Sequence, residues 1–248
     1  MDGYDPKGHG KEKAVANLTV CEVEPPHHLS KFVHRYIKIT TNVQLSRDYR
    51  FHALPDTCTY MVFNLLDDQI TGVTKLHTVS EEFNLGKRFS YLNVRFYPAV
   101  WNLCKEPVGR GLVNLPYAGI LPLTQVNGHL IGCSFKQQQR VLTALVEQLI
   151  DENVVAEHAI TQRIIQNFDI VNSVAEVASL VAMSTRQLQR VIRQATGFSP
   201  HEFLKILHLQ RTMAGGSTDH YADQSHFIHS FKKATSYTPS AYIKKYDV

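Results

Sequence analysis

The sequence predicts an α+β protein of two domains, in which a β-rich N-terminal domain is followed by an all-α domain with two helix-turn-helix units. Residues that favour strands dominate the first half of the chain. After Gly132 the hydrophobic period becomes that of a helix, and a segment near the C-terminus occurs twice. We therefore place the β-rich domain at residues 1–134, a linker helix and hinge at 135–157, and the all-α domain at 158–248.

Four segments rich in Val, Ile, Thr, Tyr and Phe indicate the strands of the first domain. They are residues 32–40, 49–65, 73–80 and 89–98. The first fourteen residues lack an apolar run, so they are interpreted as a mobile tail and not as a signal peptide. Arg95 stands in an otherwise apolar strand, where it could anchor an anionic effector or form a buried structural ion pair.

The linker is expected to be helical over residues 136–152 because Phe135, Leu142, Leu145 and Leu149 fall on one side of a helix. This apolar face has two readings. It could pair with its counterpart in a homodimer, the reading that we favour, or it could pack on the sheet of its own chain. Residues 151–157 are expected to form a hinge.

The all-α domain begins with a helix from Ala159 to Phe168 and continues with a helix-turn-helix unit. Ser173 and Glu176 predict a capping box, in which the serine caps an early amide and the glutamate reaches back to the serine amide. Ser184 supplies a second cap of the same kind, and Gly197 stands where a left-handed residue ends the second helix. Residues with a predicted inward position in the two helices are Val174, Val177, Ala178, Val181, Leu188, Val191, Ile192 and Ala195.

Residues 184–203 are repeated at 223–242, so that Ser184 corresponds to Asp223 and Pro200 to Pro239. The outward side of the first copy carries Arg186, Gln189, Arg190 and Arg193, flanked by Thr185 and Gln187. Arginine pairs with guanine and glutamine with adenine in the major groove. We expect Arg193, farther from the helix start, to contact phosphate. In the second copy, the equivalent outward residues are Gln224, Ser225, His229 and Lys232.

Charge supports a polyanionic partner for this part of the chain. Residues 161–248 contain ten Lys or Arg and six Asp or Glu, whereas residues 1–160 contain sixteen of each kind. Lys205, Lys244 and Lys245 are further candidates for phosphate contacts. The simpler alternative is a solvated basic face on a surface helix, and the paired caps and the repeat argue against it.

At residues 174–200, 221–233 and 237–239 the chain resembles the AraC/XylS family of bacterial transcription regulators. The resemblance implies a seven-helix domain in which one longer helix joins two helix-turn-helix units. It also implies base contacts by Arg186, Gln189 and Arg190 in the first unit and by Gln224, Ser225 and His229 in the second.

For an activator of this family, promoter DNA and RNA polymerase are the implied partners, and the β-rich domain often binds an effector or mediates dimerisation. The chain departs from the family pattern at residues 212–221, where Gly215 and Gly216 replace a supporting helix.

Other classes of function find less support. No apolar run is long enough for a membrane span, and four scattered cysteines fit a reducing cytoplasm. His226 and His229 could bind a metal, but the second helix-turn-helix unit explains them better, so no metal and no cofactor is expected. A DNA-repair alkyltransferase needs an activating histidine beside its cysteine, whereas Lys105 follows Cys104.

We therefore expect a protein that is not an enzyme, with an unknown small-molecule effector still open. A third class is a protein-interaction or anti-activator role, in which the shortened second unit has lost its affinity for DNA.

Overall fold

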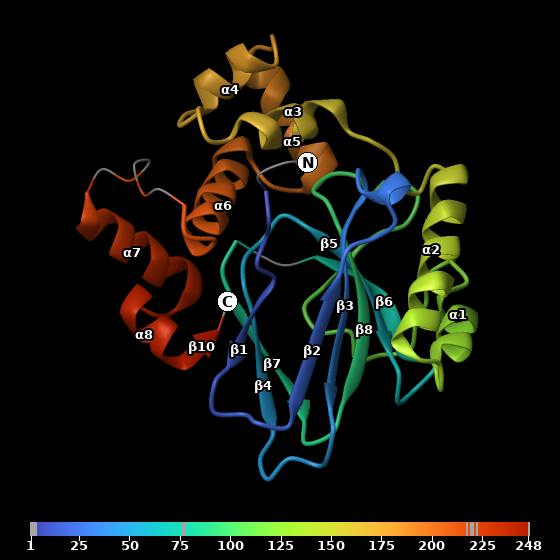
Figure 1. Cartoon of the computed structure of the whole chain (residues 1–248). Coiled ribbons are helices and arrows are strands. Elements are labelled where there is room, and N and C mark those ends of the chain that lie inside the picture. The colour runs from blue at the N-terminus through green and yellow to red at the C-terminus, as the bar shows by residue number, and fades with distance from the viewer. Residues whose placement is uncertain (1–3, 76–77, 217, 219–220, 222, 248) are drawn as a thin grey trace.

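The computed structural model describes residues 4–75, 78–216, 218, 221 and 223–247. It has a β-rich N-terminal part followed by a helical C-terminal part, so the predicted fold class is confirmed. Two sheets form a sandwich, with helices against both of its outer faces (Figure 1).

The larger sheet has the strand order β2-β3-β8-β5-β6-β9. Its members are β2 (Leu18–Val23), β3 (Val33–Thr41), β8 (Ser90–Phe96), β5 (Thr59–Asn64), β6 (Thr71–Lys75) and β9 (Gly109–Arg110). The smaller sheet has the order β10-β1-β4-β7 and consists of β10 (Tyr246–Asp247), β1 (His9–Glu12), β4 (Tyr49–Ala53) and β7 (Glu81–Gly86). Neighbouring strands are antiparallel, except for β6 and β9, which are parallel.

The four strand segments predicted from the sequence correspond to β3, to β4 with β5, to β6 and to β8. The segment predicted at 73–80 ends as a strand at Lys75, and Leu76 and His77 lie outside the described residues. The prediction of a mobile tail is wrong for residues 4–14. Tyr4 is only 3% exposed, and β1 pairs with β4 on one side and with β10 on the other.

Alternation along the strands gives the larger sheet one face toward helices and one toward the smaller sheet. The helices are α1 (Leu123–Leu130) and α2 (Phe135–Asp151), and the buried side chains Leu142, Leu145 and Val146 of α2 join the main core. The hydroxyl of Tyr36 in β3 lies 3.0 Å from that of Thr143 in α2. The apolar face of α2 therefore packs on the sheet of its own chain, and the preference for a dimer through this face is wrong.

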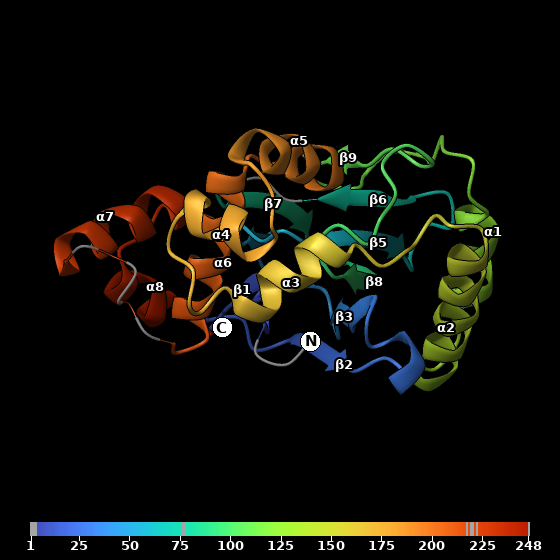
Figure 2. The ribbon, with the colours of Figure 1, turned by 90° about the horizontal axis from the view of Figure 1, so that it is seen from above.

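The C-terminal part contains α3 (Ala159–Asn167), α4 (Val174–Leu180), α5 (Thr185–Thr196), α6 (Pro200–Met213), α7 (Gln224–Thr235) and α8 (Pro239–Lys245). Helices α3 to α5 lie across one end of the sandwich, and α7 and α8 lie beside the smaller sheet (Figures 1 and 2). The family resemblance implies seven helices, whereas the described residues from 159 onward form six.

The helical part is docked on the sandwich through backbone and side-chain contacts. Ser80 N–H donates to the Ala234 carbonyl at 2.7 Å, and Lys13 N–H donates to the Lys245 carbonyl at 3.1 Å. The segment expected to form a hinge, residues 151–157, is also attached to the N-terminal part, because Ala156 N–H donates to the Val100 carbonyl at 2.8 Å. The boundaries assigned from the sequence to the β-rich domain (1–134), the linker and hinge (135–157) and the all-α domain (158–248) remain predictions.

Candidate nucleic-acid interface

The first helix-turn-helix unit is built by α4 and α5 with a short turn between them. The Ser173 side chain accepts from Glu176 N–H, as predicted, but the Glu176 carboxylate accepts from Asn172 N–H at 2.7 Å instead of from the serine amide. At the start of α5, Ser184 and Gln187 form a full capping box. The helix ends at Gly197, which has a φ of 76°, and a residue without Cβ adopts this conformation at no steric cost.

Helix α5 has one buried side and one exposed side. Leu188 and Ile192 are 0% exposed, while the six predicted DNA-contacting residues of this helix are exposed. These are Thr185, Arg186, Gln187, Gln189, Arg190 and Arg193. The helix therefore offers an uncovered row of hydrogen-bond donors, with cationic groups near its N-terminal end, on a surface that the protein core does not need.

Helix α7 reproduces α5 in its local geometry. Asp223 caps its first turn by accepting from His226 N–H, and Ser236 ends it with a φ of 67°. Thr196 and Thr235 each donate to the carbonyl four residues earlier, at 2.7 and 2.8 Å. The predicted contact residues Gln224, Ser225, His229 and Lys232 are all exposed.

The support of α7 differs from that of α5. Helix α4 packs beside α5, but among residues 214–216, 218, 221 and 223 the structure has no helix that could play this part for α7. Residues 217, 219, 220 and 222 lie outside the described set. A cluster of Leu54, Leu209, Phe231, Ala234, Tyr242 and Tyr246 instead packs α7 and α8 on the smaller sheet. The sandwich therefore supplies the scaffold of the second unit.

Two lysines have roles that the sequence did not reveal. Lys75 of β6 donates to the Thr196 carbonyl at the end of α5, at 2.8 Å, and lies over the Phe198 ring. The Lys245 ammonium donates to the Tyr237 hydroxyl at 2.8 Å and lies 4.9 Å from the ring centres of Tyr237 and Tyr246. Lys245 is therefore engaged in an aromatic cluster, whereas Lys205 and Lys244 are exposed.

Between the two sheets lies a cavity of about 700 Å³, counted out to its open mouth. Its walls are mainly apolar side chains of both sheets, and Arg95 and Asn93 of β8 provide polar groups. No long-range pairing of strands can be read from one sequence, so this cavity was not predicted.

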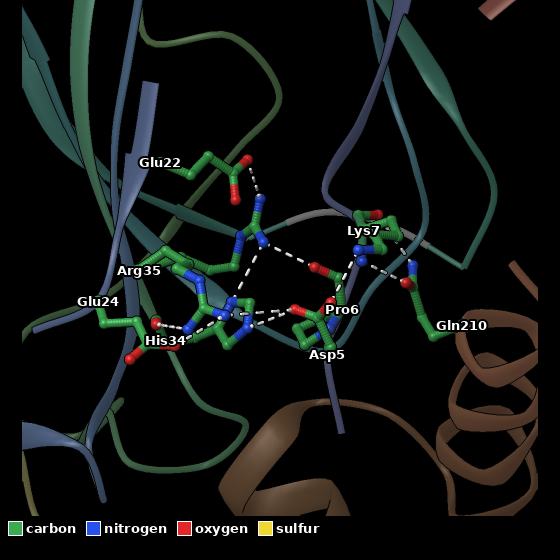
Figure 3. Close-up of polar contacts among 9 residues, drawn as sticks. Asp5, Pro6, Lys7, Glu22, Glu24, His34, Arg35 and Gln210 are labelled. Atoms are coloured by element: carbon green, nitrogen blue, oxygen red, sulfur yellow. Dashed lines mark hydrogen bonds and ion pairs between the residues drawn. The ribbon is translucent and has the colours of Figure 1, made fainter. Parts of the chain in front are cut away.

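Residues 5–7 of the N-terminal segment lie between His34 of β3 and Gln210 of α6 (Figure 3). Arg95 Nη1 donates to the Pro6 carbonyl at 2.6 Å, and the next residue, Lys7, donates its N–H to Gln210 Oε1 at 2.6 Å. Arg95 Nη2 also lies 3.4 Å from Glu22 Oε1. The sequence left two roles open for Arg95, an anchor for an anionic effector or a buried structural ion pair, and the structure shows the ion pair.

Comparison with known proteins gives one family match. A family model described as "Domain of unknown function (DUF6597)" matches residues 21–110, from β2 to β9. No curated protein matches the chain.

Solved structures of ToxT from Vibrio cholerae are similar to this chain at low identity. ToxT from strain O395 is 11% identical with a TM-score of 0.40, over 92% of this chain and 96% of that chain. The unsaturated-fatty-acid-bound wild-type ToxT from strain SCE256 is 10% identical with a TM-score of 0.41, over 95% and 97% of the two chains.

Proposed function

We propose that this protein is a cytoplasmic, sequence-specific DNA-binding regulator of transcription, of the AraC/XylS type that its C-terminal sequence resembles. The observation that carries this proposal is the division of α5 into a buried apolar side and an exposed side with Arg186, Gln189 and Arg190. A helix held in this way by a capped neighbour is suited to entering the major groove with its first turns.

In the proposed complex, Arg186 and Arg190 read guanine and Gln189 reads adenine, while Arg193 contacts phosphate. Gln224, Ser225 and His229 of α7 contribute a second set of base contacts, with Lys232 at the backbone. Thr185 and Gln187 lie in the first turn of α5, and we propose that they contact the phosphates that flank the groove.

The N-terminal domain is proposed to control binding through a small-molecule effector in the cavity between the sheets. A homodimer and a contact with RNA polymerase belong to the same proposal. Since α2 is covered on its apolar side by its own sheet, a dimer would use another surface.

A second candidate function is an interaction or anti-activator role without strong DNA affinity. The observation that favours it is the absence, among the described residues between α6 and α7, of a helix to support α7 in the usual way. The two candidates differ in salt dependence, because a DNA-binding protein that neutralises phosphates loses affinity steeply with salt.

The proposal is tested by selecting bound duplexes from a random DNA pool and measuring the affinity of the selected sequence. We expect Arg190→Ala to weaken specific binding by about 1–3 kcal/mol. The matched control is Arg140→Ala, which removes the same charge from an exposed position on α2. Failure to select any sequence, or equal affinities of the two variants, would overturn the assignment.

A further inference from the structure

Helices α5 and α7 can be compared residue by residue, because their ends fix one register for both. Ser184 and Asp223 cap the two helices at their starts, and Gly197 and Ser236 end them in the left-handed conformation. In this register the three residues of α5 that are proposed to contact bases have counterparts in α7. Arg186 corresponds to Ser225, Gln189 to Ile228 and Arg190 to His229. Ile228 therefore stands where the first unit has the side chain proposed to read adenine.

Ile228 is exposed, although it is apolar. It is 38% exposed, and its spacing from Ser225 and Lys232 places it on their side of α7. Among the exposed residues of α7, a helix that is described over its whole length, Ile228 is the one without a polar group. Helix α7 lies at the outer edge of the molecule in both views (Figures 1 and 2). This side of the helix is therefore open to another molecule.

The folded protein does not depend on an isoleucine at this position. Phe231 and Phe227 provide the apolar contacts that hold α7 on the smaller sheet, and Ile228 belongs to none of the core clusters of the described residues. A β-branched side chain also has a lower helix propensity than a straight-chain one. The residue at this position is therefore free to serve binding.

The major groove of DNA has one base that matches an apolar side chain. Thymine presents its 5-methyl group there, and apolar side chains contact this group, whereas the other bases present hydrogen-bond donors and acceptors alone. Isoleucine has no donor or acceptor, so it would leave the polar groups of any other base unpaired, which is costly where water is excluded. Ile228 in the major groove therefore selects thymine.

A protein partner fits this surface less well than DNA does. The exposed residues around Ile228 on the helix are polar, so its side chain is isolated and not part of an apolar patch. The core of a protein interface is depleted of charge, whereas Lys232 and Lys233 follow Ile228 on the exposed surface of the same helix. These two cations suit the phosphates on either side of a groove.

We propose that Ile228 is a specificity-determining residue, which contacts the methyl group of one thymine in the part of the DNA site that α7 reads. The two units then select different bases, because α5 presents arginine and glutamine where α7 presents serine, isoleucine and histidine. This inference rests on the proposed function, since it requires α7 to enter the major groove, and it adds the base that α7 selects.

Replacement of thymine by deoxyuridine tests the contact, because it removes the methyl group and leaves the base pairing unchanged. Each thymine of the duplex selected from the random pool is replaced in turn, and the affinity of the full chain is measured by fluorescence anisotropy. We expect one replacement to weaken binding of the parent about fourfold, which corresponds to about 0.8 kcal/mol for one buried CH2-sized group. Ile228→Ala should bind the thymine and deoxyuridine forms of that duplex equally.

Two further variants make the test specific to this side chain. The matched control is Ile120→Ala, which removes the same atoms from a position in the N-terminal part that is 83% exposed, and it should keep the fourfold effect. Ile228→Gln gives α7 the residue that α5 has at this position, and the preferred base there should change from thymine to adenine. Circular dichroism and thermal unfolding should be the same for the parent and all three variants, since both positions are exposed.

The inference is overturned if no thymine of the selected duplex is sensitive to the loss of its methyl group. It is also overturned if the sensitivity persists in Ile228→Ala, because the methyl group would then contact another residue. In both cases a selected duplex exists, so the proposed function stands and the role of Ile228 alone is rejected. If the protein selects no duplex, the proposed function and this inference are both rejected.

Discussion

Phe51 and His52 are neighbours in β4 and face opposite sides of the smaller sheet. The Phe51 ring lines the cavity and stacks with the Phe83 ring at 6.4 Å between centroids. The His52 ring stacks on Tyr246 at 4.9 Å and lies 5.5 Å from the ring of Tyr242 in α8. A single layer of sheet therefore separates the cavity from α7 and α8, the helices of the proposed second DNA-contacting unit.

A substitution at Gly10 of β1 would test how closely the smaller sheet and α8 must approach each other. A Cβ atom at this position would lie 3.0 Å from Tyr246 Cβ and closer still to the Tyr242 hydroxyl. We expect Gly10→Ala to push α8 away from the sheet and to destabilise the protein by about 1–3 kcal/mol, as overpacking does. Hydrogen exchange should accelerate in α7 and α8 but not in α5, and equal protection in all three helices would contradict the expectation.

The helices of the C-terminal part could be predicted from the sequence because their determinants are local. Ser184 and Gln187 cap α5 within one turn, and the spacing of Leu188 and Ile192 sets the buried side, so the exposure of Arg186 and Arg190 follows. The same reasoning located α2 but not its partner. An apolar stripe indicates that one side of a helix is buried, but it does not identify the surface that covers it.

The pairing of distant strands could not be predicted. β1 and β10 have the polar sequences HGKE and YD, and they join the smaller sheet through backbone hydrogen bonds that leave no side-chain pattern. The cavity depends on how the two sheets meet, so the sequence neighbours of Asn93 and His9 give no sign that these two residues line the same cavity.

The ends of the two repeated helices provide a second test. Ser236 has the same left-handed conformation as Gly197, with φ values of 67° and 76°, and a residue with a Cβ pays for this conformation. We expect Ser236→Gly to raise the free energy of unfolding by about 1 kcal/mol. Gly197→Ser should lower it, because a Cβ there would also displace the Lys75 ammonium from its hydrogen bond with the Thr196 carbonyl. Thermal unfolding measures both, and a Ser236→Gly variant that is less stable than the parent would refute the comparison.

Acid sensitivity should arise in part from His34. Burial lowers the pKa of His34 from 6.5 to about 4, although its hydrogen bond with Asp5 opposes this shift. The unfolded chain therefore binds a proton that the folded chain does not, and stability present above pH 6.5 is lost as the pH falls toward about 4. His34→Gln should show a smaller loss of stability than the parent between about pH 7.5 and pH 5 in urea unfolding. An equal loss in the two proteins would mean that other groups carry the effect.

Arg190 and Arg193 both lie on the exposed side of α5, and Arg193 is farther from the start of the helix. We therefore expect Arg190 to support sequence-specific binding and Arg193 to support binding to any duplex. If Arg193 contacts phosphate, Arg193→Ala weakens binding to all duplexes similarly and lowers the salt slope by about 0.9 log units per log unit of salt. Arg190→Ala should instead reduce the preference for the selected sequence over a scrambled duplex. Affinities measured over a salt series for both duplexes separate the two roles. If Arg193→Ala leaves the salt slope unchanged and abolishes the preference for the selected sequence, the roles assigned to Arg190 and Arg193 are wrong.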